Sequence, residues 1–419
     1  MNHLFVDSIE VTCDTILCSY HVEGEWEKYF SEQRNISIAY SIDISEVPES
    51  IAVIPFICNV LPIVWLCDAK LHVKSLDEKF YSHIEQIRQG YTTMYPMLKF
   101  GGTVETQIVK NIPVECRHSA AAFFSGGVDA YTTLLRHIDE KPVLMTIWGA
   151  DIKLNDTIGW NNVKAHTTMV AEQLAIESVF IKSDFRSVIR ESKLSKELVS
   201  NSGDSWWHGF QHGIGIISHA APIAYTYGMK KVYIASSYPD SMKGMYTCAS
   251  NPLIDNHVHF CECDTVHDGC ELDRQGKVHY LMERQKELDT DINLRVCWEI
   301  SGGNNCCRCE KCYRTILEIV SEGGNPNNFG FVWGDKDIKR CEKDIKNKIQ
   351  LHQFQWDQYY PLIQKMLKKN KNIIVDIEKY QWIQEIDFSN INNRIMKKLR
   401  YSVFGRGIRK VMRKISARG

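Results

Sequence analysis

The sequence predicts an α/β protein in which a parallel sheet carries helices on both faces. Two observations support this fold class. Between residues 118 and 237, apolar segments of strand length alternate with segments of helical length. The strand segments are apolar throughout instead of alternating apolar and polar residues, which is typical of parallel strands buried on both faces.

The elements of this pattern follow in a regular order. The expected strands are at 120–124, 142–148, 178–183 and 231–237, and the expected helices are at 129–137, 160–175 and 209–229. Each helix joins two successive strands, as expected for a sheet that is covered on both faces.

Residues 1–117 are expected to form a separate α+β domain of unknown role. Segments 4–13 and 36–45 alternate like strands, and segment 75–91 has helical spacing with Ser75 as its N-cap. No chemistry is predicted for this domain.

Segment 51–67 is apolar enough to resemble a membrane span. It is short for one, and Pro55, Asn59 and Pro62 interrupt it. Two buried strands joined by a turn are therefore expected there, and no transmembrane segment.

The rest of the chain is expected to divide into a nucleotide-binding domain at 118–325 and a helical C-terminal extension at 326–419. The extension ends in a basic tail, which from Asn393 onwards holds ten Lys or Arg residues and no acid. A basic amphipathic helix in this tail would bind an acidic partner or lie on an anionic membrane surface. A disordered, solvated tail is the alternative.

Charge and cysteine content narrow the class of protein. The 50 Lys and Arg residues balance 51 Asp and Glu residues, so the overall charge does not indicate nucleic acid binding. The chain has 15 cysteines but no recognisable signal peptide at its N-terminus. A cytoplasmic location is expected, with the thiols used for packing or for metal binding.

Ser125, Gly126 and Gly127 end the first strand of the α/β pattern, and Asp129 opens the next helix. Glycines at a strand-to-helix turn leave backbone N–H groups exposed, and the helix dipole adds positive charge there. The turn is therefore suited to hold phosphate. It has neither the Gly-Lys-Ser/Thr ending of a Walker loop nor the G-x-G-x-x-G spacing.

The sequence S-G-G-V-D resembles the PP-loop, S-G-G-x-D-S, of the ATP pyrophosphatase superfamily, which has an adenine nucleotide α-hydrolase-like fold. The resemblance implies ATP and Mg²⁺ as ligands and cleavage between the α- and β-phosphates. It implies that the nucleotide-binding residues are Phe124, Ser125, Gly126, Gly127, Val128, Asp129 and, through the backbone of its strand, Trp148. Where the family has serine after the aspartate, this chain has Ala130, which removes one hydroxyl from the phosphate site.

Cys297, Cys306, Cys309 and Cys312 form a C-x8-C-x2-C-x2-C pattern. Four thiolates with two tight C-x2-C steps suit a tetrahedral Zn²⁺ ion, and a site filled by four protein ligands is structural. An iron–sulfur cluster is the competing interpretation, because it also takes four cysteines. Cys307 is out of register with the four.

A PP-loop followed by this cysteine pattern is similar to the 7-cyano-7-deazaguanine synthase family, over residues 118–320. The resemblance implies an ATP-dependent carbon–nitrogen ligase that adenylates a carboxylate, releases pyrophosphate and forms an amide or nitrile with ammonia or an amine. A deazapurine acid is one such carboxylate. The family often has Tyr-Pro-Asp after a later strand, which implies catalytic roles for Tyr238 and Asp240 beside Asp129.

Two other functions remain open. A PP-loop sulfur transferase acting on RNA or a small molecule would need a reactive cysteine, for which Cys248 and Cys307 are the candidates. A non-catalytic nucleotide-binding module is the other, and Ala130 favours it. The rings in segment 204–213 are expected in the core rather than against a ligand, and the His/Cys-rich segment 257–270 is expected to be a loop.

Overall fold

The computed structural model describes residues 2–113 and 116–392. The basic tail lies outside the described residues. The chain forms two compact units, of which the first comprises Met1–Asp273 with Ser301–Gly303 and the second comprises Arg274–Ile300 with Asn304–Gly419. The expected boundary at 117 falls inside the first unit, and the four cysteines of the expected metal site belong to the second.

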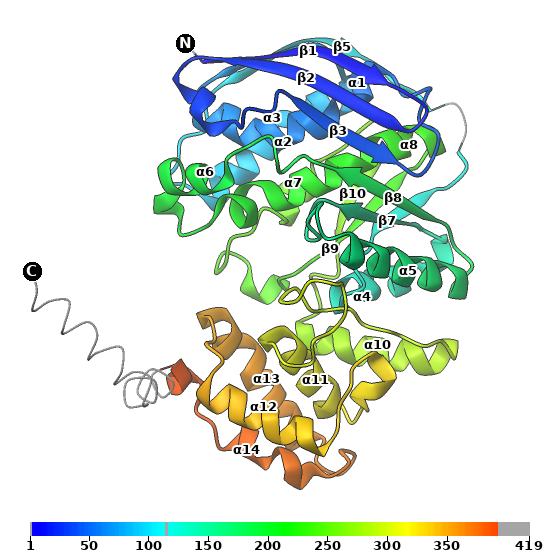
Figure 1. The fold of residues 1–419 in the computed structure, drawn as a ribbon, viewed down its shortest axis with the longest axis vertical. Helices are drawn as coiled ribbons and strands as arrows, with labels where there is room; N and C mark the ends of the chain where they lie inside the picture. The colour runs from blue at the N-terminus through cyan, green and yellow to red at the C-terminus, as the bar shows by residue number, and fades with distance from the viewer. Residues whose placement is uncertain (1, 114–115, 393–419) are drawn as a thin grey trace, which may run out of the picture. The chain divides into compact units, whose positions relative to one another are not determined.

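The first unit contains a ten-stranded sheet in the order β10-β9-β6-β7-β8-β3-β2-β1-β4-β5 (Figure 1). Its strands are β1 (His3–Val11), β2 (Thr15–Glu23), β3 (Asn35–Tyr40), β4 (Lys70–Asp77), β5 (Thr103–Val109), β6 (Ala120–Phe123), β7 (Val143–Trp148), β8 (Ser178–Ser183), β9 (Lys231–Ala235) and β10 (Asp264–Asp268).

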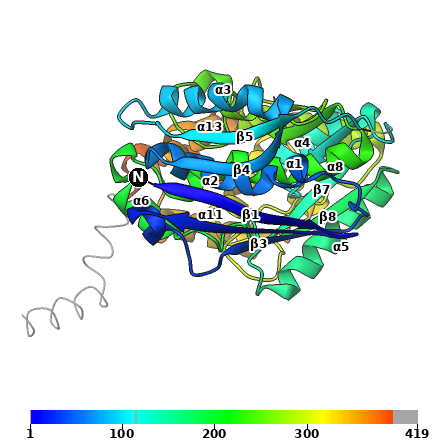
Figure 2. The same ribbon diagram turned by 90° about the horizontal axis from the view of Figure 1, so that it is seen from above.

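Strands β6 to β10 pair only in parallel with one another, as the apolar segments predict. Strand β3 pairs antiparallel with β8 and so joins the N-terminal strands to this parallel part. Figure 2 shows β1, β4 and β5 lying side by side in the N-terminal part of the sheet. Residues 1–117 therefore extend the sheet instead of forming one of their own.

Helices cover both faces of the parallel strands. The helices of the first unit are α1 (Glu49–Ala52), α2 (Ile54–Leu66), α3 (Glu78–Met94), α4 (Val128–Arg136), α5 (Thr157–Gln173), α6 (Glu191–Glu197), α7 (His212–Ile217), α8 (Ala221–Tyr227) and α9 (Pro252–Asp255). Ala121 and Phe123 of β6 face the large core that contains α2, α7 and α8, whereas Ala120 and Ala122 face the opposite side with Tyr233. Helix α4 packs on β6 and β9, and α5 packs on β7 and β8.

The prediction of two strands at 51–67 is wrong, because this segment forms α1 and α2. Helix α2 is buried nearly all round, which explains its apolar residues on every side. Pro55 stands in its first turn, where no backbone N–H is needed. Asn59 is satisfied inside the core, since it donates to the Phe185 carbonyl at 2.8 Å and accepts from Gln211 at 2.5 Å. Across the described residues no helix is long and apolar enough to cross a membrane.

Two other helix predictions need correction. Asp77, and not Ser75, caps α3, because its carboxylate accepts from the Phe80 N–H at 3.0 Å while Ser75 lies in β4. The expected helix at 209–229 is divided into a π-helical turn (Trp207–Gln211), α7, a short 3₁₀ turn and α8. Pro222 lacks the N–H that a continuous α-helix would use and stands at the start of α8.

The second unit is helical. Its helices are α10 (Arg274–Leu288), α11 (Glu310–Ser321), α12 (Asp335–Asn347), α13 (Tyr360–Lys369) and α14 (Gln381–Gln384). Helix α11 packs on α10 and on α13. A buried ion pair between Arg274 and Glu318, with 3.1 Å between Nε and Oε2, links α10 to α11.

Candidate functional site

The Ser125–Gly127 turn connects β6 to α4. Gly126 has φ of +76°, a conformation that costs little without a Cβ atom. Gly127 is the extended N-cap residue of α4, and its N–H donates to Ser125 Oγ at 3.4 Å. The turn thus leads directly into the positive end of a nine-residue helix that begins at Val128.

Two hydrogen bonds and one ring contact hold Phe124, the residue before the turn, in the core. The Phe124 N–H donates to the Met145 carbonyl at 2.8 Å, and Thr146 Oγ1 donates to the Phe124 carbonyl at 2.8 Å. The Phe124 ring meets the edge of Tyr131 with 4.9 Å between centroids. Among the predicted nucleotide-binding residues, Phe124 and Val128 are therefore buried supports whose main chain alone faces the turn.

The order of the strands places this turn at a topological switch point. Connections from β6 run through β7 to β8 on one side, whereas β9 and β10 lie on the other side of β6. In open parallel sheets such a point forms a crevice at the carboxyl ends of the two strands, and ligands bind there. Each β6 residue pairs with the β9 residue 111 positions later, and the same offset brings Ser236 level with Ser125.

Tyr238 and Asp240 follow β9 and so leave the sheet at the same edge as the turn. Asp240 is exposed, and its N–H donates to the Cys270 carbonyl at 2.6 Å. The Tyr238 hydroxyl lies 3.4 Å from His208 Nε2. The indole of Trp148 stacks on Trp160 with 5.3 Å between ring centroids.

The sequence prediction missed Asp268, which fixes α4 on the sheet. It stands at the end of β10 and accepts from Thr133 Oγ1 at 2.8 Å and pairs with His137 Nε2 at 3.0 Å and Arg136 Nε at 3.3 Å. Burial opposes ionisation of Asp268, but these donors outweigh it and hold its pKa below the ordinary value. The sequence of β10, Asp-Thr-Val-His-Asp, has an acid at each end and no apolar run, so no sequence pattern marked Asp268 as an anchor.

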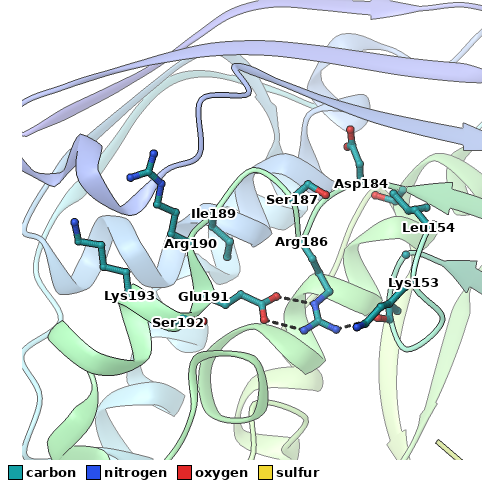
Figure 3. Close-up of a pocket in the computed structure, with 13 residues that line it drawn as sticks. Lys153, Leu154, Asp184, Arg186, Ser187, Ile189, Arg190, Glu191, Ser192 and Lys193 are labelled. Carbon is teal, nitrogen blue, oxygen red and sulfur yellow. Dashed lines mark hydrogen bonds and ion pairs between the residues drawn. The ribbon is translucent and has the colours of Figure 1, made fainter. Parts of the chain in front are cut away.

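A cavity of about 620 Å³ lies at the carboxyl ends of β7 and β8 (Figure 3). Arg186 crosses it, with Nε and Nη2 bonded to the two carboxylate oxygens of Glu191 at 2.6 and 2.8 Å and Nη1 bonded to the Ala150 carbonyl at 2.9 Å. Its guanidinium also lies 3.8 Å from the ring centre of Trp207. The four basic side chains of the lining are Lys153, Arg186, Arg190 and Lys193, and its two acids are Asp184 and Glu191.

The four predicted cysteine ligands come together in the second unit. Their sulfur atoms lie within 4.8 Å of one another, with 3.8 Å between Cys297 and Cys309 and 3.9 Å between Cys306 and Cys312. Four sulfurs around one Zn²⁺ at about 2.3 Å would lie about 3.8 Å apart at tetrahedral corners. The arrangement fits a tetrahedral metal ion, and none of these cysteines forms a disulfide.

The surroundings of the four cysteines also suit thiolate ligands. The N–H groups of Arg308 and Cys309 donate to Cys306 Sγ at 3.4 and 3.3 Å. Cys309 caps α11, so the positive end of that helix faces the sulfurs. Cys307 stands outside the group, and its sulfur accepts from the Val332 N–H at 3.4 Å.

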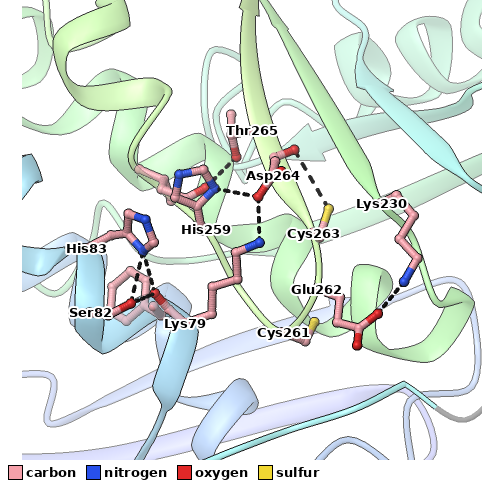
Figure 4. A network of polar contacts seen from close by, with 12 residues as sticks. Lys79, Ser82, His83, Lys230, His259, Cys261, Glu262, Cys263, Asp264 and Thr265 are labelled. Atoms are coloured by element: carbon pink, nitrogen blue, oxygen red, sulfur yellow. Dashed lines mark hydrogen bonds and ion pairs between the residues drawn. The ribbon is translucent and has the colours of Figure 1, made fainter.

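The His/Cys-rich segment 257–270 is not a loop throughout, because residues 264–268 form β10. Figure 4 shows the contacts of Asp264, the first residue of this strand. Asp264 Oδ1 pairs with Lys79 Nζ at 2.7 Å and with His259 Nδ1 at 3.0 Å. Cys261 and Cys263 are buried thiols in the core. Across the part of the chain that the structure describes, the group at 297–312 is the only set of three or more such side chains that suits a metal.

Fold and site together define an α/β protein with a large, mostly parallel sheet and a four-cysteine group able to hold a metal such as zinc. Comparison with protein-family models, with curated proteins and with solved structures finds no match.

Proposed function

We propose that this protein binds ATP and Mg²⁺ at the Ser125–Asp129 turn and adenylates a carboxylate, with release of pyrophosphate, before forming an amide or nitrile. The observation that carries the proposal is the position of an S-G-G-V-D turn at the switch point of a parallel sheet. Backbone N–H groups at the N-terminus of α4 would hold the departing pyrophosphate, and Asp129 in the first turn of α4 would hold Mg²⁺.

The chemistry explains why ATP is needed. A carboxylate is a poor electrophile because its negative charge is delocalised, and its attack on the α-phosphate converts it into a mixed anhydride. Ammonia or an amine then displaces AMP from the carbonyl carbon. Tyr238 and Asp240, which leave the sheet beside the turn, are the groups proposed to face the acid. The first acid to test is 7-carboxy-7-deazaguanine, given the resemblance of the two motifs.

The cavity beside β7 and β8 is the proposed place for an anionic substrate. Four basic side chains against two acidic ones give its lining an excess of positive charge. Glu191 pairs with Arg186, and Glu197 lies 4.0 Å from Lys193, so the surplus positive charge resides mainly on Lys153 and Arg190. Zn²⁺ in the four-cysteine group would be structural, since four sulfurs leave no position for a substrate.

Sulfur transfer is the second candidate function. It needs a reactive cysteine, and Cys248 is favoured for this role because its pKa is lowered. A non-catalytic nucleotide-binding module is the third, because Ala130 removes a family hydroxyl. The experiment that separates all three measures release of pyrophosphate from ATP in the presence of 7-carboxy-7-deazaguanine and a panel of other carboxylic acids, with mass spectrometry for AMP-linked acids.

The matched variants for this experiment are Asp129→Asn and Asp139→Asn, the second of which changes an exposed aspartate after the same helix. Acid-dependent pyrophosphate release that Asp129→Asn abolishes and Asp139→Asn preserves would support adenylation. ATP binding without pyrophosphate release for any acid would exclude it and favour the non-catalytic module.

A further inference from the structure

Asp204, His208 and Cys248 form a chain of side chains that resembles the machinery of an activated thiol. His208 Nδ1 lies 2.6 Å from Asp204 Oδ1. The other oxygen of Asp204 accepts from the Tyr95 hydroxyl at 2.7 Å and from the Thr247 hydroxyl. With both oxygens engaged, Asp204 fixes the orientation of the imidazole and leaves its Nε2 for other partners.

Cys248 is buried, with 3% of its surface exposed, and interacts with His208 and His212. Burial opposes ionisation of the thiol, but the two imidazoles outweigh it and lower the pKa of Cys248 to about 6. Asp204 first, and then Cys248, raise the pKa of His208 to about 10. These opposite shifts favour transfer of the Cys248 proton to His208. By contrast, burial raises the pKa of the Cys58 and Cys261 thiols in the same unit.

Local backbone geometry is built around this contact. The π-helical turn Trp207–Gln211 carries His208, and such turns are frequent at functional sites. A Cβ atom on Gly213 would lie 2.3 Å from the Ala249 carbonyl oxygen, and one on Gly209 would lie 2.8 Å from the Asp204 Cβ. Glycine at these two positions lets the helical segment approach both Asp204 and the segment of Cys248.

A further contact ties the same two segments together. The Ala249 N–H donates to the His208 carbonyl at 2.7 Å. This hydrogen bond holds the main chain next to Cys248 against the main chain of His208.

The cluster lies next to the proposed active edge of the sheet. His208 Nε2 is 3.4 Å from the hydroxyl of Tyr238, in the loop that follows β9. Trp207, the neighbour of His208, packs against Arg186 of the cavity. The imidazole is itself accessible, because 44% of the His208 side chain is exposed.

We propose that Cys248 is a nucleophile that receives the acyl group from the adenylated acid as a thioester, before an amine takes it. This inference rests on the proposed function. In the first step the Cys248 thiolate attacks the carbonyl carbon, a C–S bond forms, the C–O bond to phosphate breaks, and AMP leaves as an anion. In the second step the amine nitrogen attacks the thioester, the C–S bond breaks, and the thiolate returns. The nitrogen loses its proton to solvent, and no oxidant or reductant is needed.

Formation of a thioester requires a thiolate nucleophile, which explains a Cys248 with a lowered pKa. Thioesters react readily with amines, and transfer to Cys248 would free the nucleotide site before the amine binds. His208, held by Asp204, keeps the thiol ionised and stabilises it as the leaving group in the second step. Ammonia is small enough to reach the adenylated acid while the nucleotide is still bound, so it does not need the thioester intermediate. The proposal therefore favours a larger amine as acceptor.

The ionisation of Cys248 is tested without any substrate. The absorbance of thiolate at 240 nm is measured against pH for the wild-type protein minus Cys248→Ala, so that all other cysteines cancel. The expected midpoint is about 6, and His208→Gln should move it towards about 8.5, the value of an unperturbed cysteine. The matched control is wild type minus Cys58→Ala, which should show no thiolate below pH 9 because burial raises that pKa. A midpoint above 8 in the wild type would overturn the proposal.

The thioester is tested with ATP and 7-carboxy-7-deazaguanine, or any acid that supports pyrophosphate release. Intact-protein mass spectrometry after acid quenching should find an acyl adduct on Cys248 that hydroxylamine removes. Cys248→Ser should retain exchange of labelled pyrophosphate into ATP within about threefold but form amide at least about 10²-fold more slowly.

The outcomes separate the two proposals. Absence of pyrophosphate exchange with every acid would refute the proposed function itself. Normal exchange with full amide formation by Cys248→Ser would refute the thioester alone. A 32-Da adduct on Cys248 that dithiothreitol removes would replace the thioester by a persulfide and favour sulfur transfer.

Discussion

Removal of one cysteine from the 297–312 group should cost the protein its bound metal. The variant is Cys309→Ser, which takes away a thiolate 3.8 Å from Cys297. Structural zinc sites in small peptides are worth about 10 to 16 kcal/mol in total. Shared among four thiolates, this is about 2.5 to 4 kcal/mol for each, or about 10² to 10³-fold in zinc affinity.

Metal content is measured by inductively coupled plasma mass spectrometry after dialysis, and stability by thermal unfolding. Wild type should hold about one zinc per chain, and Cys309→Ser should lose most of it and unfold at lower temperature. Cys307→Ser is the matched control, because Cys307 is two residues away and outside the group. It should keep both metal and stability.

Two results would refute this reasoning. Equal loss of zinc in Cys307→Ser and Cys309→Ser would show that the sulfur geometry does not identify the ligands. Iron with acid-labile sulfide and visible absorption in the wild type would replace zinc by an iron–sulfur cluster, which also takes four thiolates.

Three further predictions concern the turn and the core. Gly126→Ala should weaken ATP binding by about 5- to 30-fold in calorimetry. The φ of +76° costs other residues about 1–2 kcal/mol, so the free turn of the variant relaxes and ATP must restore its geometry. Gly203→Ala, at φ of +80° with open space around it, should leave ATP binding unchanged. Ala130→Ser supplies the hydroxyl that the PP-loop motif has at this position and should tighten ATP binding by up to about tenfold. No gain would show that position 130 does not face phosphate. His219 is buried and its pKa is lowered to about 4, so the unfolded chain takes up a proton that the folded chain refuses as pH falls below about 6.5. Urea unfolding should therefore show about 2 kcal/mol less stability at pH 5 than at pH 7 from this group, a loss that His219→Asn should remove.

Sequence could predict the parallel part of the fold because each strand there carries its own signal. Strand β8 was expected at 178–183 and lies at Ser178–Ser183, and β7 and β9 differ from expectation by one or two residues. The four cysteines were predictable for a related reason, since a short spacing brings three of them together whatever the rest of the chain does.

Contacts that depend on distant pairing could not be predicted. Helix α2 resembles strands in sequence because a helix buried all round has no polar face to reveal its period. Asp204 and Cys248 stand 44 positions apart, and neither carries a motif that points to the other. Only the fold brings the two together, through the π-helical turn that carries His208. The sequence offered Cys248 as a candidate reactive cysteine, but it did not identify His208 and Asp204 as its partners.

The N-terminal strands have a structural role at the proposed active edge, although their sequence suggests no chemistry. Asp184, in the segment after β8, accepts from the Ser37 N–H at 2.8 Å and from Gln33 Nε2 at 2.6 Å. The Arg190 N–H donates to the Tyr29 carbonyl at 2.8 Å, a few residues further along the same segment.

This segment, residues 184–193, forms much of the lining of the cavity and carries three of its four basic side chains. A five-stranded parallel sheet that ended at β8 would leave the segment beside an open edge with unpaired backbone groups. Pairing of β3 with β8 closes that edge and anchors both ends of the segment. The N-terminal strands therefore hold one wall of the cavity in place.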